Sequence, residues 1–575
     1  MFPVYEVNEV LSNLDQRDWE LITGIWALYE KHWPELQEVE ARLTGKVLEK
    51  QEAFPFTVLG KDGTKYNIPG GYFPLKYDAS KNASVAERTE DVAKQATMAG
   101  FALGIGRSMT KERSQGRVAL PLDLRFDIIS KTLADEIHLI SFREPVRDAR
   151  RIILNDEFTA VIQGIYGINT VSMLRKWSAD CWALEPVPQT GFERVMSMLR
   201  GNMTMAVLGY RTMTAILNVL NIAPMAHYLG GPAEAMRAMK RFYARPREMY
   251  AYITQESVFM AERAQTMDVN IREAIQKGTT ADMIPGYKAV QENAFRLIAL
   301  TDLSIAMPLW LREYEKAYQE SLDNGLKPES AKRDAILAGD AAVRRVFGSS
   351  QKIDLSAVQR GSEIMKCMTM YYSYFSTLYN ALAYMIYETR QKVLGAKIRS
   401  GSWKKAVAEN KKQLLKGLAP LANGLLMWIL IPSLLDYLLR PIADDDDDKW
   451  SIENIARNTL KNSINNLTGG IPILREAVPY LMARAFGEPQ YSMGTLPVYN
   501  TVEQLNKVIQ SIASDKKTIY DVARESLRLI GTFVGFSTTL SDGLATTLEW
   551  AGTDFEASIP EYMRAVVFDR RLKKK

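Results

Sequence analysis

The sequence predicts an all-α protein, an elongated multi-helix assembly with one small β-hairpin near the N-terminus. Three observations predict this. Apolar and aromatic residues recur three and four positions apart along much of the 575 residues, which is the spacing of one helical face. The pattern of a strand pair with a tight turn stands out once, between residues 54 and 68. The 47% hydrophobic and 24% charged content is that of a globular chain.

Composition limits the class of protein. The net charge of +5 is too small for a dedicated nucleic-acid binder. Cys181 and Cys367 are far apart in apolar surroundings, which favours two buried free thiols over a disulfide framework. The first ten residues, MFPVYEVNEV, lack the basic and apolar regions of a secretory signal, so export by the ordinary pathway is not expected.

Length and the positions of Gly/Pro breaks suggest several units, since domains average about 150 residues. Five segments are expected: residues 1–85, a helical unit with the hairpin and a GGYFP loop; 86–265, a helical domain with a PLDLRF motif; 266–400, helical hairpins with a tyrosine-rich helix; 401–450, an apolar segment and an acidic loop; and 451–575, a C-terminal helical region.

The first segment opens on an aromatic helix. Trp19, Ile22, Trp26, Tyr29 and Trp33 are spaced 3, 4, 3 and 4 apart, so they share one face and are expected to pack in a core. Pro34 follows at once, where a proline kinks a helix or begins a new one.

A hairpin with Asp62-Gly63 at its turn is expected next, because Asp-Gly between two apolar runs favours a tight turn. The stretch IPGGYFPLKYD then predicts an extended, sharply turning loop. Tyr72 and Phe73 are expected to pin this loop to a neighbouring helix.

Helices are expected from Ala86 to Gln265. Gly100, Gly104 and Gly106 permit close helix contacts but lack the strand and order of a dinucleotide fingerprint. Met203 to Leu229 is apolar but contains Arg211 and His227, which favours a buried helix over a membrane span.

Residues 286–350 are expected to form soluble amphipathic helices, with Asn324-Gly325 and Pro328 at the turn between two of them. Met365 to Tyr387 contains seven aromatic residues and one charge, Lys366. Its tyrosines suit a core or protein interface, and equally a membrane interface.

The segment Gly417 to Leu439, GLAPLANGLLMWILIPSLLDYLL, is the strongest membrane signal. It has one charge, Asp436, and is followed by the acidic run Asp444 to Asp448. About 20 apolar residues suffice to cross a bilayer, and a buried helix or helical hairpin is the alternative. The membrane-candidate residues are Leu425, Leu426, Trp428, Ile429, Leu430, Ile431, Leu434 and Leu435.

No motif carries catalytic or metal-binding chemistry. His32, His138 and His227 have no His, Cys or paired carboxylate at ligand spacing, and phosphate-loop and nucleophile-elbow patterns are absent. Consecutive acids in Asp444 to Asp448 point in different directions, which favours a solvated loop over a calcium site. We therefore expect no cofactor and no enzymatic activity.

Two basic stretches could meet phosphates of DNA or of lipid headgroups, although a solvated helix face is the simpler interpretation. One is Arg107 to Arg117, and the C-terminal Arg570 to Lys575 is similar. The other contains the candidate phosphate or headgroup contacts Arg237, Lys240, Arg241, Arg245 and Arg247.

Several stretches resemble one family in order along most of the chain. PLDLRFD (Pro121 to Asp127) and the following Glu136 to Asp156 resemble the C-terminal region of large phage proteins that carry a PLxRFG motif and are grouped with polyvalent proteins. Gly70 to Asp78, Tyr372 to Glu388 and Gly469 to Val498 resemble further parts of such proteins. Here one extra residue precedes the motif's arginine, and an aspartate stands in place of its glycine.

This resemblance implies an internal virion protein that is ejected into the host, forms homo-oligomers, associates with other ejection or portal proteins, and helps to build a conduit across the envelope. Its partners would include envelope lipid and phage DNA, and the chain would be one region of a longer polypeptide. Three alternatives remain open. The first is a capsid-internal scaffold that contacts portal or DNA without entering a membrane. The second is a non-catalytic region of a larger enzyme-bearing phage polyprotein, and the third is an enzyme segment such as a polymerase, or a murein hydrolase with a scattered pair of acids.

Overall fold

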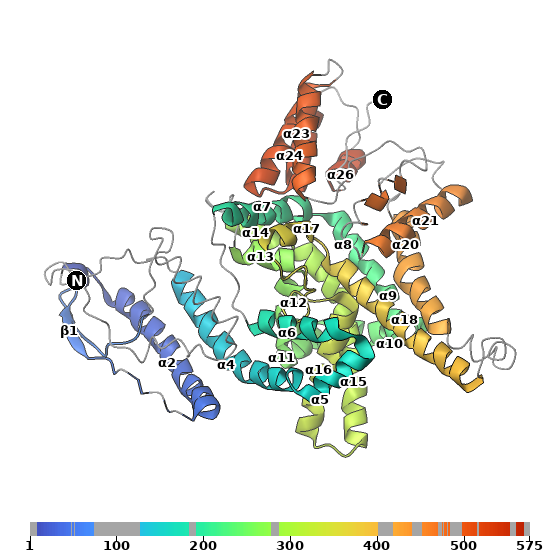
Figure 1. Ribbon diagram of the computed structural model, residues 1–575. Coiled ribbons are helices and arrows are strands. Elements are labelled where there is room, and N and C mark those ends of the chain that lie inside the picture. Colours follow the sequence, from blue (N-terminus) through green and yellow to red (C-terminus); the bar gives the residue numbers. More distant parts are fainter. Residues whose placement is uncertain are drawn as a thin grey trace. The chain divides into compact units, whose positions relative to one another are not determined.

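The computed structural model describes residues 9–45, 47, 49–50, 52–73, 127–182, 191–277, 287–400, 418–439, 451–469, 474, 477–479, 481–482, 497–513, 517–552 and 559–567. Its fold is all-α with one two-stranded antiparallel hairpin, which confirms the predicted class (Figure 1). The chain divides into two compact units, Met1–Gln189 and Thr190–Lys575. The five expected segments are finer than this division and stay predictions.

The first unit contains six described elements: α2 (Gln16–Thr44), β1 (Phe56–Leu59), β2 (Lys65–Ile68), α4 (Asp127–Ile153), α5 (Asp156–Tyr166) and α6 (Ile168–Trp182). A capping box starts α2, because the Asp15 carboxylate accepts from the Asp18 N–H while the Asp18 carboxylate accepts from the Asp15 N–H. Pro34 lies inside α2, so it does not begin a new helix. The aromatic stripe is buried at Trp19 and Tyr29 and half-buried between them, as expected for core packing.

The hairpin has the predicted turn. Phe56 pairs with Ile68 and Leu59 with Lys65, and Gly63 adopts φ +75°, which favours glycine. The loop that follows packs on α2 through Tyr72, as predicted. The Tyr72 ring contacts the Tyr29 ring edge-on, with centroids 5.5 Å apart. A Cβ at Gly71 would overlap the Trp26 indole, so only glycine lets the loop approach this closely.

The second unit contains the remaining described elements. They are α7 (Gly191–Leu208), α8 (Thr212–Asn218), η2 (Val219–Asn221), α9 (Ile222–Tyr228), α10 (Pro232–Tyr243), α11 (Pro246–Glu256), α12 (Val258–Thr266), α13 (Val269–Lys277), α14 (Tyr287–Ala294), α15 (Arg296–Asp323), α16 (Pro328–Phe347), α17 (Glu363–Met368), α18 (Ser373–Ser400), η4 (Leu426–Leu430), α20 (Ile431–Leu439), α21 (Ile452–Thr468), α23 (Pro497–Ala513), α24 (Ile519–Val534), α25 (Thr538–Gly552) and α26 (Ile559–Val567).

The largest hydrophobic core of this unit is centred on α15. The predicted turn joins α15 to α16, with Gly325 at φ +82° and Pro328 as the first residue of α16. However, Ile305 to Leu311 are buried on every side of α15 rather than on one stripe, so this part of the helix is central and not amphipathic. Trp310 packs against Gly339 of α16, where a Cβ would lie 2.8 Å from the indole nitrogen.

The apolar stretch from Met203 to Leu229 is not one helix. It breaks after α7, where Tyr210 adopts φ +60°, and the two helical parts on either side are bent by 80°. The C-terminal helices close over this break, since the Ser537 hydroxyl donates to the Gly209 carbonyl at 2.6 Å and the Tyr287 hydroxyl to the Gly535 carbonyl at 2.9 Å. The break therefore lies in a core built from distant parts of the sequence.

Charged side chains are buried with partners. Arg263, on α12, donates two hydrogen bonds to Asp302 at 2.8 and 3.1 Å and a third to the Gly348 carbonyl at 2.9 Å. Arg200 forms ion pairs with Glu273 and Glu363. Each buried charge has the compensation that a low-dielectric interior requires.

Both cysteines are free and buried, which confirms the prediction from composition. Burial raises the pKa of Cys367, and only the thiolate attacks alkylating or disulfide reagents. We expect neither thiol of the folded chain to react with an aromatic disulfide reagent at pH 8 within minutes. Both thiols should react at once in about 6 M guanidinium, which unfolds even stable domains. Rapid labelling of the folded chain, followed by absorbance, would contradict this burial.

Candidate functional site

The predicted membrane segment forms one continuous helix, Leu418–Leu439, which we call the apolar helix; it contains η4 and α20. Its 22 residues have a length of about 33 Å, enough to cross the hydrocarbon of a bilayer. Pro432 has no backbone N–H that could donate a hydrogen bond to the Trp428 carbonyl, four residues earlier. The helix widens to π geometry just before it, with the Ile431 N–H donating to the Leu426 carbonyl. Pro432 is thus accommodated within one continuous helix.

The apolar helix is largely exposed. Only 28% of its most apolar window is buried, compared with 72% for the other long apolar helix, which includes α15. Both helices are long and apolar enough to cross a membrane, and burial distinguishes them. A helix inside a core has the pattern of α15, whereas most residues of the apolar helix keep part of their surface exposed.

The eight membrane-candidate residues do not share one environment. Leu425, Leu426 and Leu430 are exposed, and Ile431, Leu434 and Leu435 are partly exposed. Trp428 and Ile429 instead face inward and are buried. They pack with Leu378 and Met385 of α18 in a small hydrophobic cluster.

Close packing and polar contacts fix the buried side of the apolar helix. A Cβ at Gly424 would overlap Met385 Sδ, so glycine permits the close approach to α18. Asn462 and Asn466 of α21 donate to Asp436 at 3.0 Å and to Ser433 at 3.1 Å. The single charge in the helix therefore has a hydrogen-bond donor.

The tyrosine-rich segment divides between the two environments that the sequence left open. Tyr372 is buried, whereas Tyr379, Tyr384 and Tyr387 of α18 are exposed. Tyrosine with an exposed ring and a wet hydroxyl is the residue that membrane and protein interfaces favour. Tyr379 is 54%, Tyr384 59% and Tyr387 43% exposed.

The five basic side chains of the stretch on α10 and α11 are exposed. Arg237 pairs with Glu234, Arg241 with Glu315 at 2.9 Å, and Arg245 with Glu248 at 3.4 Å. Lys240 and Arg247 have no such pair among the described residues. With three of its five cations neutralised, this stretch is a weaker phosphate site than its sequence suggests.

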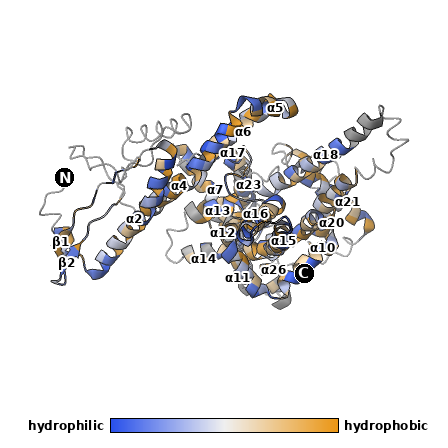
Figure 2. Ribbon diagram, turned by 90° about the horizontal axis from the view of Figure 1, so that it is seen from below, coloured by the Kyte–Doolittle hydropathy of each residue, from blue (hydrophilic) through white to orange (hydrophobic). Residues whose placement is uncertain are grey.

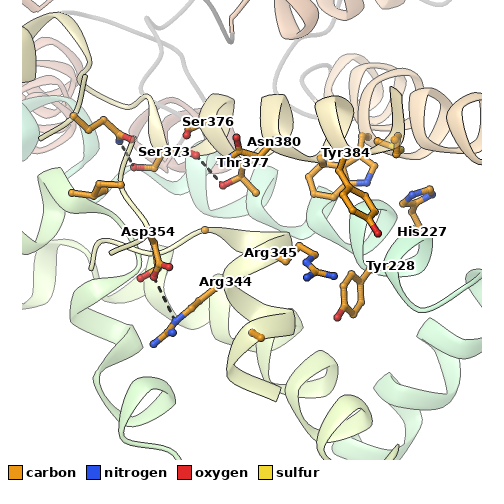
Figure 3. Close-up of a pocket in the computed structure, with 18 residues that line it drawn as sticks. His227, Tyr228, Arg344, Arg345, Asp354, Ser373, Ser376, Thr377, Asn380 and Tyr384 are labelled. Atoms are coloured by element: carbon orange, nitrogen blue, oxygen red, sulfur yellow. Dashed lines mark hydrogen bonds and ion pairs between the residues drawn. The ribbon is translucent and has the colours of Figure 1, made fainter. Parts of the chain in front are cut away.

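A cavity of about 660 Å³ lies beside the apolar helix (Figure 3). Its wall comes from α9, the end of α16, the 348–359 loop, α18 and η4. The residues that line it are His227, Tyr228, Ala341, Arg344, Arg345, Gly348, Ser349, Asp354, Leu355, Gln359, Ser373, Ser376, Thr377, Asn380, Ala381, Tyr384, Met385 and Trp428. Figure 3 shows polar side chains of α18 above Arg344 and Arg345 of α16.

Sequence reasoning missed this cavity, although one signal was present. Ser373, Ser376, Thr377, Asn380 and Tyr384 recur at helical spacing within an aromatic segment, which marks a polar stripe on one face. The sequence gives no indication that this stripe faces Arg345, because the contact depends on how α16 and α18 pack. Of the residues singled out from the sequence, His227, Trp428 and Tyr384 of the tyrosine-rich segment reach the cavity.

Other sequence features lie outside the described residues. These are the PLDLRF motif, Gly100 to Gly106, Arg107 to Arg117, Asp444 to Asp448 and Arg570 to Lys575. Among the residues that are described, no group of three or more His, Cys, Asp or Glu side chains is placed to hold a metal ion.

Comparisons with protein-family models, with curated proteins and with solved structures give no match for this chain.

Proposed function

We propose that this protein is an internal virion protein of a bacteriophage that is released into the host, oligomerises, and contacts the envelope through the apolar helix to help form a conduit for the genome. One observation carries the proposal: a 22-residue apolar helix is 28% buried in its most apolar window, although the same fold buries another helix of this kind. Contiguous exposed apolar surface of this sort marks membrane or protein contact.

The mixed environment of the apolar helix suits both states of such a protein. In the packaged particle its inward side stays packed on α18 and α21. After release its exposed leucines meet lipid, and Asp436 lies near one end of the segment, where a charge costs less than the roughly 3 kcal/mol of the bilayer centre. In this proposal the protein acts by oligomerisation and by membrane contact, without catalysis.

Further exposed apolar surface supports self-association. In the first unit, α5 has no buried residue, and Val161, Ile165 and Tyr166 are exposed; Figure 2 marks apolar residues of α5 in orange. On α18, the exposed tyrosines add aromatic surface. Partners of the released protein would be copies of itself, other ejection or portal proteins, and envelope lipid. In this proposal, phage DNA contacts the assembly or passes through it.

Flotation with lipid vesicles tests the proposal. The double variant Leu426→Asp/Leu430→Asp alters two residues four apart with 39% and 46% exposure. Asp in place of Leu costs about 3 kcal/mol each within hydrocarbon, so we expect the vesicle-bound to free ratio to fall about 100-fold or more. Ile429 is unsuitable for this test, since its burial makes any substitution a test of folding.

The matched control is Leu505→Asp/Ile509→Asp on α23, with the same spacing and 48% and 55% exposure. It is expected to float like the wild type. If the wild-type protein stays in the soluble fraction, the chain acts as a capsid-internal scaffold instead. Equal loss in both double variants would mean that general surface hydrophobicity, not the apolar helix, binds the vesicles.

A further inference from the structure

The cavity beside the apolar helix has an excess of positive charge. Arg344 lies 3.5 Å from Asp354 and donates to the Gln351 side chain at 2.8 Å, so it is engaged. Arg345 has no carboxylate within ion-pair distance among the described residues; its guanidinium lies 5.9 Å from the centre of the Tyr228 ring. Asp354 is the one acid in the wall, so the wall holds two arginines and one carboxylate.

The adjoining region does not cancel this charge. Arg345 also borders a smaller cavity of about 360 Å³, together with Arg312, Lys316, Glu234 and Glu313. These four residues are two cations and two acids, and Glu313 also interacts electrostatically with Arg345, without an ion pair between them. The walls of the two cavities together therefore contain one more positive than negative charge, and Arg345 belongs to both walls.

Uncommitted hydrogen-bond donors line the same space. Trp428 is 3% exposed, and its buried indole Nε1–H has no acceptor among the described residues. Buried donors almost always have a partner, because a missing one costs about 1–3 kcal/mol. Ser376 and Asn380 also make no side-chain hydrogen bond within the described part of the chain. An occupant that brings acceptor oxygens would engage these groups.

The remaining wall is apolar. Leu355, Ala381, Met385 and the Trp428 ring line it, and Trp428 belongs to the apolar helix. An occupant with a small anionic end and an apolar body would match the two halves of the cavity. Its apolar body would leave along the surface that we expect to meet lipid.

We propose that this cavity binds the phosphodiester headgroup of an anionic phospholipid, with Arg345 and Asn380 as the main contacts of the phosphate. This assignment rests on the proposed membrane contact and names the lipid class that it recognises. Guanidinium is the side chain best suited to phosphate oxygens, and basic pockets between helices are known to hold anionic headgroups. A volume of about 660 Å³ is ample for a headgroup and the first part of its chains.

Isothermal titration of the full chain with dihexanoyl phosphatidylglycerol, a soluble short-chain lipid, tests the cavity without a bilayer. We expect saturable binding that Arg345→Gln weakens about ten-fold, the effect of losing one charged hydrogen bond. Asn380→Leu should weaken it several-fold. Arg333→Gln is the control, because Arg333 is an exposed arginine of α16 with no ion pair among the described residues; it should bind like the wild type.

Three results would overturn the assignment. The first is no binding of the probe, and the second is equal weakening by Arg333→Gln. The third is equally tight binding of inorganic phosphate, which would assign the cavity to free phosphate. The double variant Leu426→Asp/Leu430→Asp keeps the cavity residues, so it should still bind dihexanoyl phosphatidylglycerol while losing flotation. The experiment can therefore disprove lipid binding in the cavity without disproving membrane contact by the apolar helix, and the reverse.

Discussion

Replacement of Arg263 by leucine is expected to lower the free energy of unfolding by about 3–5 kcal/mol. The Arg263 side chain is fully buried, and its guanidinium holds Asp302 through two hydrogen bonds and the Gly348 carbonyl through a third. It also lies near the Phe259 and Phe347 rings, at 5.9 and 5.6 Å from their centres. Leucine fills part of the volume but leaves a buried carboxylate without its cation.

Guanidinium unfolding, followed by circular dichroism, measures this loss as a lower midpoint. Arg245→Leu is the control, since Arg245 pairs with Glu248 at 3.4 Å on the surface and such pairs contribute less than about 1 kcal/mol. The double variant Arg263→Leu/Asp302→Leu should recover part of the stability, because it removes the stranded charge as well. A single variant as stable as the control would show that the pair is not buried in solution.

Trp310→Ala is expected to cost about 3–5 kcal/mol by leaving a cavity in the largest core. The Trp310 ring is fully buried, stacks on Tyr314 with centroids 4.9 Å apart, and donates from Nε1 to Asp340 at 2.8 Å. The close approach of Gly339 means that α16 packs directly on the indole face. Loss of the ring removes this contact, the stack and the hydrogen bond together.

Urea unfolding of Trp310→Ala and Trp310→Phe separates these contributions, because phenylalanine keeps much of the volume but not the donor. The phenylalanine variant should lose less stability than the alanine variant. Leu337→Ala is the control, because Leu337 is an exposed residue of α16; this substitution should change the midpoint little. A Trp310→Ala effect under about 1 kcal/mol would mean that α15 is not the centre of the core.

Exposure of the apolar helix and burial of α15 have different consequences for the protein. Substitutions on α15 are expected to act on folding, whereas substitutions at Leu426 and Leu430 are expected to act on lipid contact with folding unchanged. Stability and flotation therefore separate the two roles of apolar sequence in this chain. Trp428 joins both roles, because it packs inward and also lines the cavity.

Local patterns in the sequence were sufficient for much of the fold. The Asp62-Gly63 turn and the Asn324-Gly325 turn depend on neighbouring residues alone, and both occur as expected. Periodicity likewise predicted the aromatic face of α2. Periodicity failed for Met203 to Leu229, which looked like one helix, because the reversal at Tyr210 is held by contacts with α14 and the C-terminal helices.

The sequence by itself determined an all-α chain with one hairpin, two free thiols and a segment apolar enough to cross a bilayer, because these follow from spacing, turn chemistry and composition. Only the tertiary structure decided that α15 is central while the apolar helix stays partly exposed, although both helices are long and apolar enough to cross a membrane. It also decided that Arg237 is paired while Arg345 faces a cavity. The physical reason is that burial and pairing depend on side chains brought together from distant positions, such as His227, Arg345, Asn380 and Trp428, and no local pattern specifies those contacts.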